Sequence, residues 1–373
     1  MVAVPKLSRR ARWAVPAGAL VITGAVLAGS LIPAAQAAPG LPSRTPAQLL
    51  AQVASSAAPP LTGTVVETAS LGLPSLPGTS DPTSIAALLT GSHTVHVWYG
   101  GARHFRLAVP GPLNETDLIA DGSTAWLWQS TANAVTEYSL PAHQGVPQTQ
   151  PTLALTPQQA AQQVLAAAGP TTTVRVDSNV MVAGQAAYEL VLAPKDARSL
   201  VGQVQIAIDG RNGVPLRLQV YPRGASSPAF EVGYTAIQFV TPAPAELTFT
   251  PPPGAKVTHV NLARQPASGP AAPPDVSAVG SGWLTVLDAP AAGLTAAGSG
   301  TAVSGGAAAG SSADSGAVLA ALLGSATPVS GAWGSGRLLR TSLISVLITG
   351  GGRVFAVAVQ PSVLYAAAEA AGS

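Results

Sequence analysis

The stretch that most constrains the fold is residues 118–140, LIADGSTAWLWQSTANAVTEYSL, in which apolar and polar side chains alternate. Alternation with a period of two is typical of β-strands, and Asp121-Gly122 is a pair suited to a tight turn. Trp126 and Trp128 are two residues apart, so both project from the same face of a strand. They either pack in a core or line a pocket for an apolar ligand. The stretch therefore predicts a hairpin or meander and leaves the role of the tryptophans open.

More strand-like segments lie on both sides of this hairpin, at residues 61–69, 94–99, 103–109, 172–182, 187–192, 201–208, 216–221, 231–239 and 246–249. Residues 46–57 and 157–168 instead have helical periodicity. Each of these two segments begins with Thr-Pro and has a glutamine three residues after the threonine, which is the pattern of a capped helix start. Successive strands with short connections favour one antiparallel sheet, and the two helices are available to cover its apolar face.

The side chains that catalysis or metal binding would need form no recognisable motif. The chain has no cysteine and five histidines. His93 and His96 are three residues apart, so on a strand they point to opposite faces and do not make a metal pair. No serine lies in a G-x-S-x-G elbow, and no glycine-rich phosphate loop is present. We therefore expect a protein that is not an enzyme and that has no metal ion or cofactor.

The first 37 residues have the pattern of an export signal. Basic residues up to Arg12 precede an apolar run at 14–32, and Ala35-Gln36-Ala37 has small residues at the positions of a cleavage site. We expect export with cleavage after Ala37. Because the apolar run is longer than a typical signal core, an uncleaved N-terminal membrane anchor is the alternative. Without this segment the chain has 14 basic and 16 acidic residues, so nothing indicates a nucleic-acid partner.

Composition divides the rest of the chain into three parts. Residues 38–260 contain the strands and helices of a main domain. Residues 261–316 are rich in Pro, Ala and Gly and are expected to form a flexible linker. Residues 317–373 contain two strand-like segments, at 343–348 and 354–359, followed by a helical one. We expect a small C-terminal module of one β-hairpin and one helix, which needs a surface to cover because a lone hairpin is marginal in water.

Several short motifs resemble those of the LolA-like superfamily of exported lipid and lipoprotein carriers, specifically its actinobacterial branch. They are DGSTAWLW at 121–128, YELVLAPKD at 188–196, ID at 208–209 with PLR at 215–217, and FTPPPG at 249–254. The resemblance covers roughly residues 45–257. The segment GRLLRTSLISVLITGGGRVFAVAVQPSVLYAAAE near the C-terminus resembles the small final domain of MucB/RseB-type sensors, which share the LolA-like fold.

The resemblance implies an α+β fold in which a strongly curved antiparallel sheet forms a half-barrel and helices cover its concave face over an apolar cavity. It therefore favours the interpretation of Trp126 and Trp128 as cavity residues. We expect the cavity lining to consist of aromatic and apolar residues from several strands, namely Trp98, Phe105, Trp126, Trp128, Tyr138, Tyr188, Leu190, Leu216, Tyr221 and Phe230.

Two functions follow from the resemblance. The first is a non-catalytic carrier that binds lipid, or the acyl chains of a lipoprotein, outside the cytoplasmic membrane and contacts the membrane transiently. The second is a MucB/RseB-like sensor that binds a membrane-anchored regulator, an anti-sigma factor, and so controls an extracytoplasmic stress response. Neither function implies a cofactor or a nucleic-acid partner.

Overall fold

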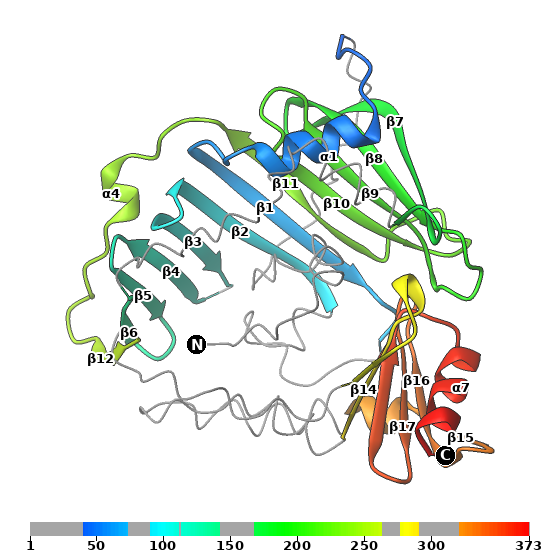
Figure 1. The fold of residues 1–373 in the computed structure, drawn as a ribbon. Coiled ribbons are helices and arrows are strands. Elements are labelled where there is room, and N and C mark those ends of the chain that lie inside the picture. Colours follow the sequence, from blue (N-terminus) through cyan, green and yellow to red (C-terminus); the bar gives the residue numbers. More distant parts are fainter. Residues whose placement is uncertain are drawn as a thin grey trace.

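The structure is a computed structural model that describes residues 40–73, 90–111, 113–141, 168–262, 277–290 and 321–372. The expected export segment and the expected helix at 157–168, apart from Ala168, lie outside these ranges. The described chain forms one sheet of 12 strands and one of 6 strands (Figure 1). In these ranges, none of the helices has the length and apolar character needed to cross a bilayer.

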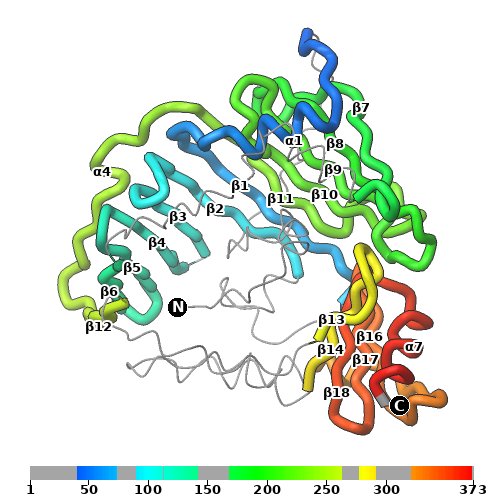
Figure 2. The backbone as a smooth tube through the Cα atoms, in the orientation of Figure 1, coloured from blue at the N-terminus to red at the C-terminus, as the bar shows by residue number. Residues whose placement is uncertain are grey.

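The larger sheet consists of two meanders that meet where β1 (Leu61–Ser70) pairs with β11 (Phe230–Gln238). The first meander continues through β2 (Thr90–Gly101), β3 (His104–Pro110), β4 (Glu115–Asp121), β5 (Thr124–Gln129) and β6 (Ala134–Ser139). The second consists of β7 (Thr172–Val182), β8 (Gln185–Pro194), β9 (Val201–Asp209), β10 (Pro215–Pro222) and β11. At the far edge β12 (Lys256–Asn261) pairs with β6 in parallel, whereas the other neighbours are antiparallel. Figure 2 shows that this sheet curves strongly without closing into a barrel.

The stretch 118–140 forms the end of β4, all of β5 and all of β6, as its alternation predicts. The turn between β4 and β5 uses Gly122 at φ 64°, a left-handed conformation that glycine adopts without the steric cost of a side chain. The register pairs Ala125 with Tyr138 and Trp126 with Glu137. Trp126 and Trp128 therefore share one face of the sheet, which is the predicted arrangement.

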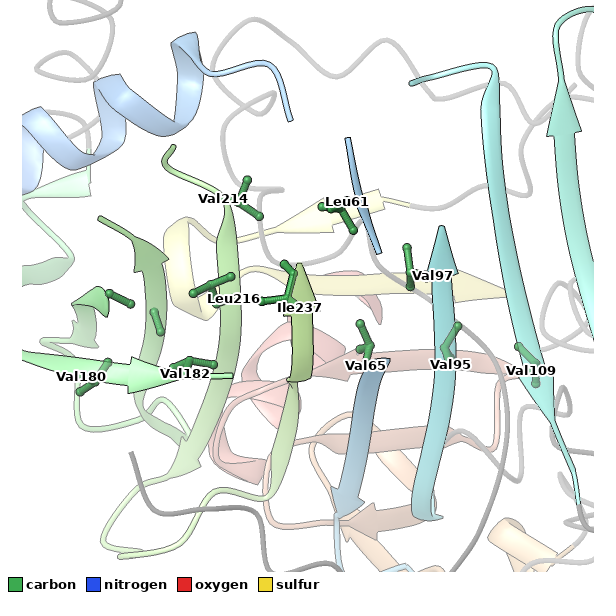
Figure 3. Packing of buried hydrophobic residues seen from close by; sticks show 12 residues of the cluster. Leu61, Val65, Val95, Val97, Val109, Val180, Val182, Val214, Leu216 and Ile237 are labelled. Carbon is green, nitrogen blue, oxygen red and sulfur yellow. The ribbon is translucent and has the colours of Figure 1, made fainter. Parts of the chain in front are cut away.

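A central core holds the two meanders together. Its buried valine, leucine and isoleucine side chains follow one another across the strands from β7 to β3, as Figure 3 shows. At the junction, Leu61 and Val65 of β1 are 3% and 7% exposed, and Ile237 of β11 is 5% exposed. Fully burying such a side chain is worth about 1.5–3 kcal/mol, so the junction is well stabilised although the strands that meet there are far apart in sequence.

Helix α1 (Pro46–Ser55) begins as the sequence predicts. The Thr45 hydroxyl accepts a hydrogen bond from the Gln48 backbone N–H, and the Gln48 side chain accepts one from the Thr45 N–H. Leu49 is fully buried and belongs to one cluster with Tyr188, Leu190 and Ile208 of β8 and β9. Helix α1 therefore covers one face of the sheet at its β7–β9 end, and we call this the helix face.

The chain between β11 and β12 packs on the opposite face. This segment, residues 239–255, includes the short helix α4 (Pro244–Leu247) and Phe249. The prediction of a strand at 246–249 is wrong, because Pro244 begins a helical turn there and no strand follows it. The Phe249 ring centroid lies 6.1 Å from that of Trp126 and 6.4 Å from that of Trp128. We call the segment the strap and the face it covers the strap face. In Figure 1 the strap runs along the outside of the curved sheet, so the helix face is the inner, concave one.

The smaller sheet belongs to a C-terminal module, residues 277–290 and 321–372. Its strands are β13 (Ser277–Val279), β14 (Val286–Pro290), β15 (Thr327–Gly331), β16 (Gly334–Arg340), β17 (Ser345–Thr349) and β18 (Arg353–Val357). A short 3-10 helix, η1 (Gly282–Leu284), connects β13 to β14. Helix α7 (Pro361–Gly372) packs on the sheet through Leu364, which is buried with Leu347 and Phe355.

Two sequence-based expectations about this region need correction. Strands β13 and β14 lie within residues 261–316, which composition predicts to be a linker, and the expected hairpin is part of a sheet of 6 strands. The physical reason is that a lone hairpin leaves both of its edges unpaired. Strand β14 covers the outer edge of β18, and its buried Asp288 accepts a hydrogen bond from Arg353 at 2.9 Å.

The C-terminal module is docked on the larger sheet. The Leu200 N–H donates to the Ala358 carbonyl at 2.9 Å, and the Ser342 N–H donates to the Leu71 carbonyl at 2.9 Å. Leu343 of the module is buried in a cluster that includes Leu71, which directly follows β1 of the larger sheet. The larger sheet therefore provides the packing surface that a module of this small size was expected to need.

Candidate functional site

The residues predicted to line one cavity lie on both faces of the sheet, so they cannot all do so. Cross-strand pairing puts Trp98 opposite Arg106, Ile119 opposite Trp126, and Asp117 opposite Trp128. These side chains share the strap face, because the Phe249 ring of the strap lies tilted against both Trp126 and Trp128. Tyr221 lies on the same face, since it donates a hydrogen bond to Gln219 at 3.3 Å next to the pair formed by Gln219 and Glu231.

The expectation that Trp98, Trp126, Trp128 and Tyr221 line a concave cavity is therefore wrong. Alternation correctly groups the tryptophans on one face, but it does not say which face is concave. The strap decides this, and it is separated from β5 by more than a hundred residues of sequence. Trp126 and Trp128 instead form a small second core between β5 and the strap.

An ion pair completes this second core. The Arg106 Nε donates to Asp117 Oδ2 at 2.9 Å, and the Arg106 guanidinium lies 5.3 Å from the centre of the Trp98 ring. The Asp117 side chain is only 2% exposed. Burial raises the pKa of Asp117 to about 6, although Arg106 acts in the opposite direction. This cluster stabilises the packing of side chains on the strap face, because Arg106 binds Asp117 and also lies over the Trp98 ring.

Tyr188, Leu190, Leu216 and Phe230 are all part of packed cores. Tyr188 and Leu190 lie beneath α1, and the Tyr188 hydroxyl donates to the Pro42 carbonyl at 2.7 Å. Leu216 is 1% exposed in the central core. Phe230 packs in the cluster that joins the larger sheet to the C-terminal module. Of the predicted lining residues, Phe105 and Tyr138 are the two that lie on the helix face outside these cores.

Phe105 and Tyr138 belong to a continuous apolar surface on the helix face of β2–β6. One row across the strands contains Tyr99, Phe105, Ala120, Ala125 and Tyr138, and the next contains Val97, Leu107, Leu118, Leu127 and Thr136. We use the term apolar face for the half-buried members of these rows, which are Tyr99, Phe105, Leu107, Leu118, Leu127 and Tyr138.

The two faces of β2–β6 differ sharply in charge. These strands lie entirely within the described ranges, and none of their Asp, Glu, Lys or Arg side chains points to the helix face. The strap face of the same strands carries five charged residues, Arg106, Glu115, Asp117, Asp121 and Glu137. Tyr99, Leu107, Leu118 and Leu127 are not among the predicted lining residues, although their alternation with the charged positions is the signal that reveals them.

A buried carboxyl group lies on the same side of the sheet as the apolar face, two rows of paired residues away from the row of Val97 and Leu107. Glu67 of β1 points to the helix face between His93 of β2 and Val232 of β11. It is 7% exposed, and burial raises its pKa to about 7. Among the described residues, its Oε2 atom has no hydrogen-bond partner. The His93 ring forms a hydrogen bond to the Thr90 carbonyl through Nε2 at 3.0 Å.

A groove of ≈ 380 Å³ opens at the other end of the sheet, between the start of α1 and the start of β7. It is lined by Thr45, Pro46, Ala47, Gly169, Thr172 and Val174. Because β7 is the edge strand farthest from β12, the groove is separate from the apolar face. Across the described ranges, no three His, Asp or Glu side chains gather closely enough to hold a metal ion.

No family model matches the sequence, and no curated protein matches it. Solved structures do resemble it. The MucA/MucB complex of Pseudomonas aeruginosa matches with a TM-score of 0.39 and 14% identity, over 86% of this chain and 95% of that chain. A LolA superfamily protein from Nitrosomonas europaea matches with a TM-score of 0.21 and 11% identity, over 56% of this chain and 99% of that chain.

MucB and the LolA superfamily protein are thus among the solved structures whose fold this chain resembles. An uncharacterized conserved protein from Thermus thermophilus is also similar, with a TM-score of 0.33 and 13% identity, over 57% of this chain and 98% of that chain. At these identities and TM-scores the likenesses carry no conclusion about a ligand or a partner. The function is therefore argued from the residues of this chain.

Proposed function

We propose that the chain is an exported, non-catalytic carrier that binds lipid or acylated protein through the apolar face. The observation that carries this proposal is the contrast between the two faces of β2–β6. The helix face has aromatic and aliphatic side chains and no Asp, Glu, Lys or Arg, whereas the strap face of the same strands has five such residues. A half-buried apolar surface of this kind on the concave side of a sheet is suited to a hydrocarbon chain.

The energetics of acyl-chain burial support such a carrier. Burying a methylene group contributes about 0.8 kcal/mol, so a partly enclosed chain of about ten carbons reaches useful affinity without specific polar contacts. The LolA-like motifs in the sequence and the expected export signal agree with this function. In the proposal, helices cover the concave face, and α1 does so over β7–β9.

Mass spectrometry of organic extracts from the purified native protein tests the proposal. We expect acyl-chain lipids that copurify with the protein after export, at close to one equivalent per chain. The control is the same protein unfolded in denaturant and washed before extraction, which should release the lipid. A native protein that yields no lipid, and that takes up no fluorescent fatty acid after delipidation, contradicts a carrier function.

The C-terminal module favours a second candidate, a sensor that binds a membrane-anchored regulator. The module is held on the larger sheet by backbone hydrogen bonds at Leu200 and Ser342, next to the end of β1. This arrangement gives a partner protein two adjoining surfaces, whereas a simple carrier needs only one. A stable complex with an anti-sigma factor, isolated from membranes of the source cell, supports the sensor. Its absence together with bound lipid leaves the carrier.

A further inference from the structure

Glu67 differs from the other buried carboxyl groups of the described chain because it has no partner. Asp117, Glu189 and Asp288 each accept a hydrogen bond from an arginine. Asp209 accepts hydrogen bonds from backbone N–H groups of its own turn. Glu67 Oε2 accepts none. An unsatisfied buried acceptor destabilises a fold, so Glu67 is not explained by the stability of the sheet.

The position of Glu67 connects it to the proposed ligand surface. A row of paired residues on the helix face leads to it from beneath α1, and this row contains Leu190, Ile206, Leu218, Val232, Glu67 and His93. On the other side, Val65 and Gly63 of the same strand pair with Val95 and Val97, which adjoin the apolar face. The Val65–Val95 pair therefore lies between the carboxyl group and the row of Val97 and Leu107, so a chain that extends from the apolar face along β1 and β2 leads to Glu67.

No basic residue closely follows Glu67 in the sequence. Residues 71–92, which connect β1 to the middle of β2, contain no Lys or Arg. The residues that face Glu67 from its two paired strands are His93 and Val232. Within the described ranges, neither strand that pairs with β1 places a permanent cation opposite Glu67, whereas Asp117, Glu189 and Asp288 each have an arginine.

We infer that the Glu67 carboxylate binds a primary ammonium group at the end of an amphipathic ligand whose hydrocarbon chain lies on the apolar face. This inference rests on the proposed function and names the polar chemistry of its ligand. A primary ammonium supplies the missing positive charge and has three N–H donors for the carboxylate oxygens. A fatty acid or an alkyl phosphate would instead place an anion next to Glu67.

The pH dependence of binding follows from the same contact. A primary alkylammonium stays protonated up to about pH 10, whereas the pKa of Glu67 is raised to about 7. More of the carboxyl group is ionised at pH 8 than at pH 6, so affinity for the ammonium ligand rises over this range. His93 is the titratable side chain that faces Glu67 from the paired strand β2.

Calorimetric titration of the delipidated full chain tests the inference with three probes that share one hydrocarbon chain. Decylammonium carries charge and N–H donors, decyltrimethylammonium carries charge without donors, and decanol has a neutral hydroxyl group. We expect decylammonium to bind roughly tenfold more tightly than the other two at pH 8, because a charge-assisted hydrogen bond is worth about that factor. The preference should fall at pH 6.

Glu67→Gln should abolish this preference and its pH dependence while leaving the affinity for decanol within about twofold. The matched control is Glu246→Gln in α4 on the strap, which should retain the preference of the wild type. If Glu67→Gln keeps the preference, or if wild-type affinity for decylammonium is the same at pH 6 and 8, the inference is wrong. If decanol still binds in that case, the proposed carrier function is not contradicted. If no probe binds the wild type, the carrier function and this inference fail together.

Discussion

Buried charges in this chain depend on whether an arginine lies beside them. Asp117 is buried with Arg106, and Glu189 with Arg217, whose Nη2 lies 3.0 Å from the carboxylate. Removing one partner of a buried pair leaves an uncompensated charge, which costs more than the pair itself contributes. Glu67 already has an uncompensated carboxyl group, so its substitution should act in the opposite direction.

Arg106→Met should destabilise the chain by about 3 kcal/mol at pH 7.5, because Asp117 would be left charged and buried. Arg175→Met is the matched control, since Arg175 pairs with the exposed Asp177 and should cost less than about 1 kcal/mol. Urea unfolding measures both values. Equal losses in the two variants would show that the strap-face pair is no more important than a surface pair.

Glu67→Gln should stabilise the chain at pH 8 and have little effect at pH 4. The folded pKa of Glu67 is raised from 4.5 to about 7, so the wild type loses stability as the pH rises through that range. Glutamine does not titrate, and the variant should gain up to about 3 kcal/mol above pH 7. Urea unfolding at both pH values provides the measurement. A loss of stability at pH 8 would mean that the ionised carboxylate has a favourable partner.

At the scale of elements, the strap is what separates the two faces of β2–β6. It brings Phe249 against Trp126 and Trp128, and the Asn133 side-chain amide donates to the Gly254 carbonyl at 3.1 Å. Strand β12 then pairs with β6 in parallel. The strap and β12 therefore cover the edge and part of the outer face of the sheet.

Phe249→Ala should loosen the strap and leave ligand binding intact. Loss of the phenylalanine ring costs about 2–3 kcal/mol for a partly buried site and exposes Trp126 and Trp128 to water. Tryptophan fluorescence should shift to the red and thermal unfolding should begin earlier. Affinity for a fluorescent fatty acid should stay within about twofold. A large loss of affinity without unfolding would mean that the strap takes part in binding.

Local sequence patterns predicted the helices and strands better than they predicted which elements pack against one another. The capping box at Thr45 and Gln48 predicted α1, and alternation predicted β1–β11 because each strand carries its own signal. The inner face was not predictable, because it depends on where the strap packs. Strands β13 and β14 were missed because they are only 3 and 5 residues long and lie among glycine- and proline-rich segments. Glu67 alternates with apolar neighbours like a solvent-facing residue, so its burial also depends on packing between distant strands.

At the scale of the whole molecule, the C-terminal module and the larger sheet share a buried interface. Leu343 is 7% exposed and belongs to the same cluster as Leu71 and Val204. The Trp283 indole N–H adds a hydrogen bond to the Thr172 hydroxyl at 2.7 Å. The two parts should therefore unfold together.

Leu343→Asp should separate the module from the sheet, because it places a charge in an apolar interface. Ile344→Asp is the matched control, since its side chain is next in sequence but 38% exposed. Calorimetry should show two unfolding transitions for Leu343→Asp and one for the control. A single unchanged transition in both variants would contradict a cooperative interface.

The central claim is that the inner face of β2–β6, and not its outer face, binds an acyl chain. Titration of a fluorescent fatty acid into four single variants tests it most directly. We expect Phe105→Ala and Tyr138→Ala to lower affinity by roughly tenfold, because each removes apolar surface worth about 1.5 kcal/mol or more. Trp126→Ala and Trp128→Ala should lower stability and leave affinity within about twofold. The reverse outcome, with affinity lost in the folded tryptophan variants and kept in the other two, would contradict the claim.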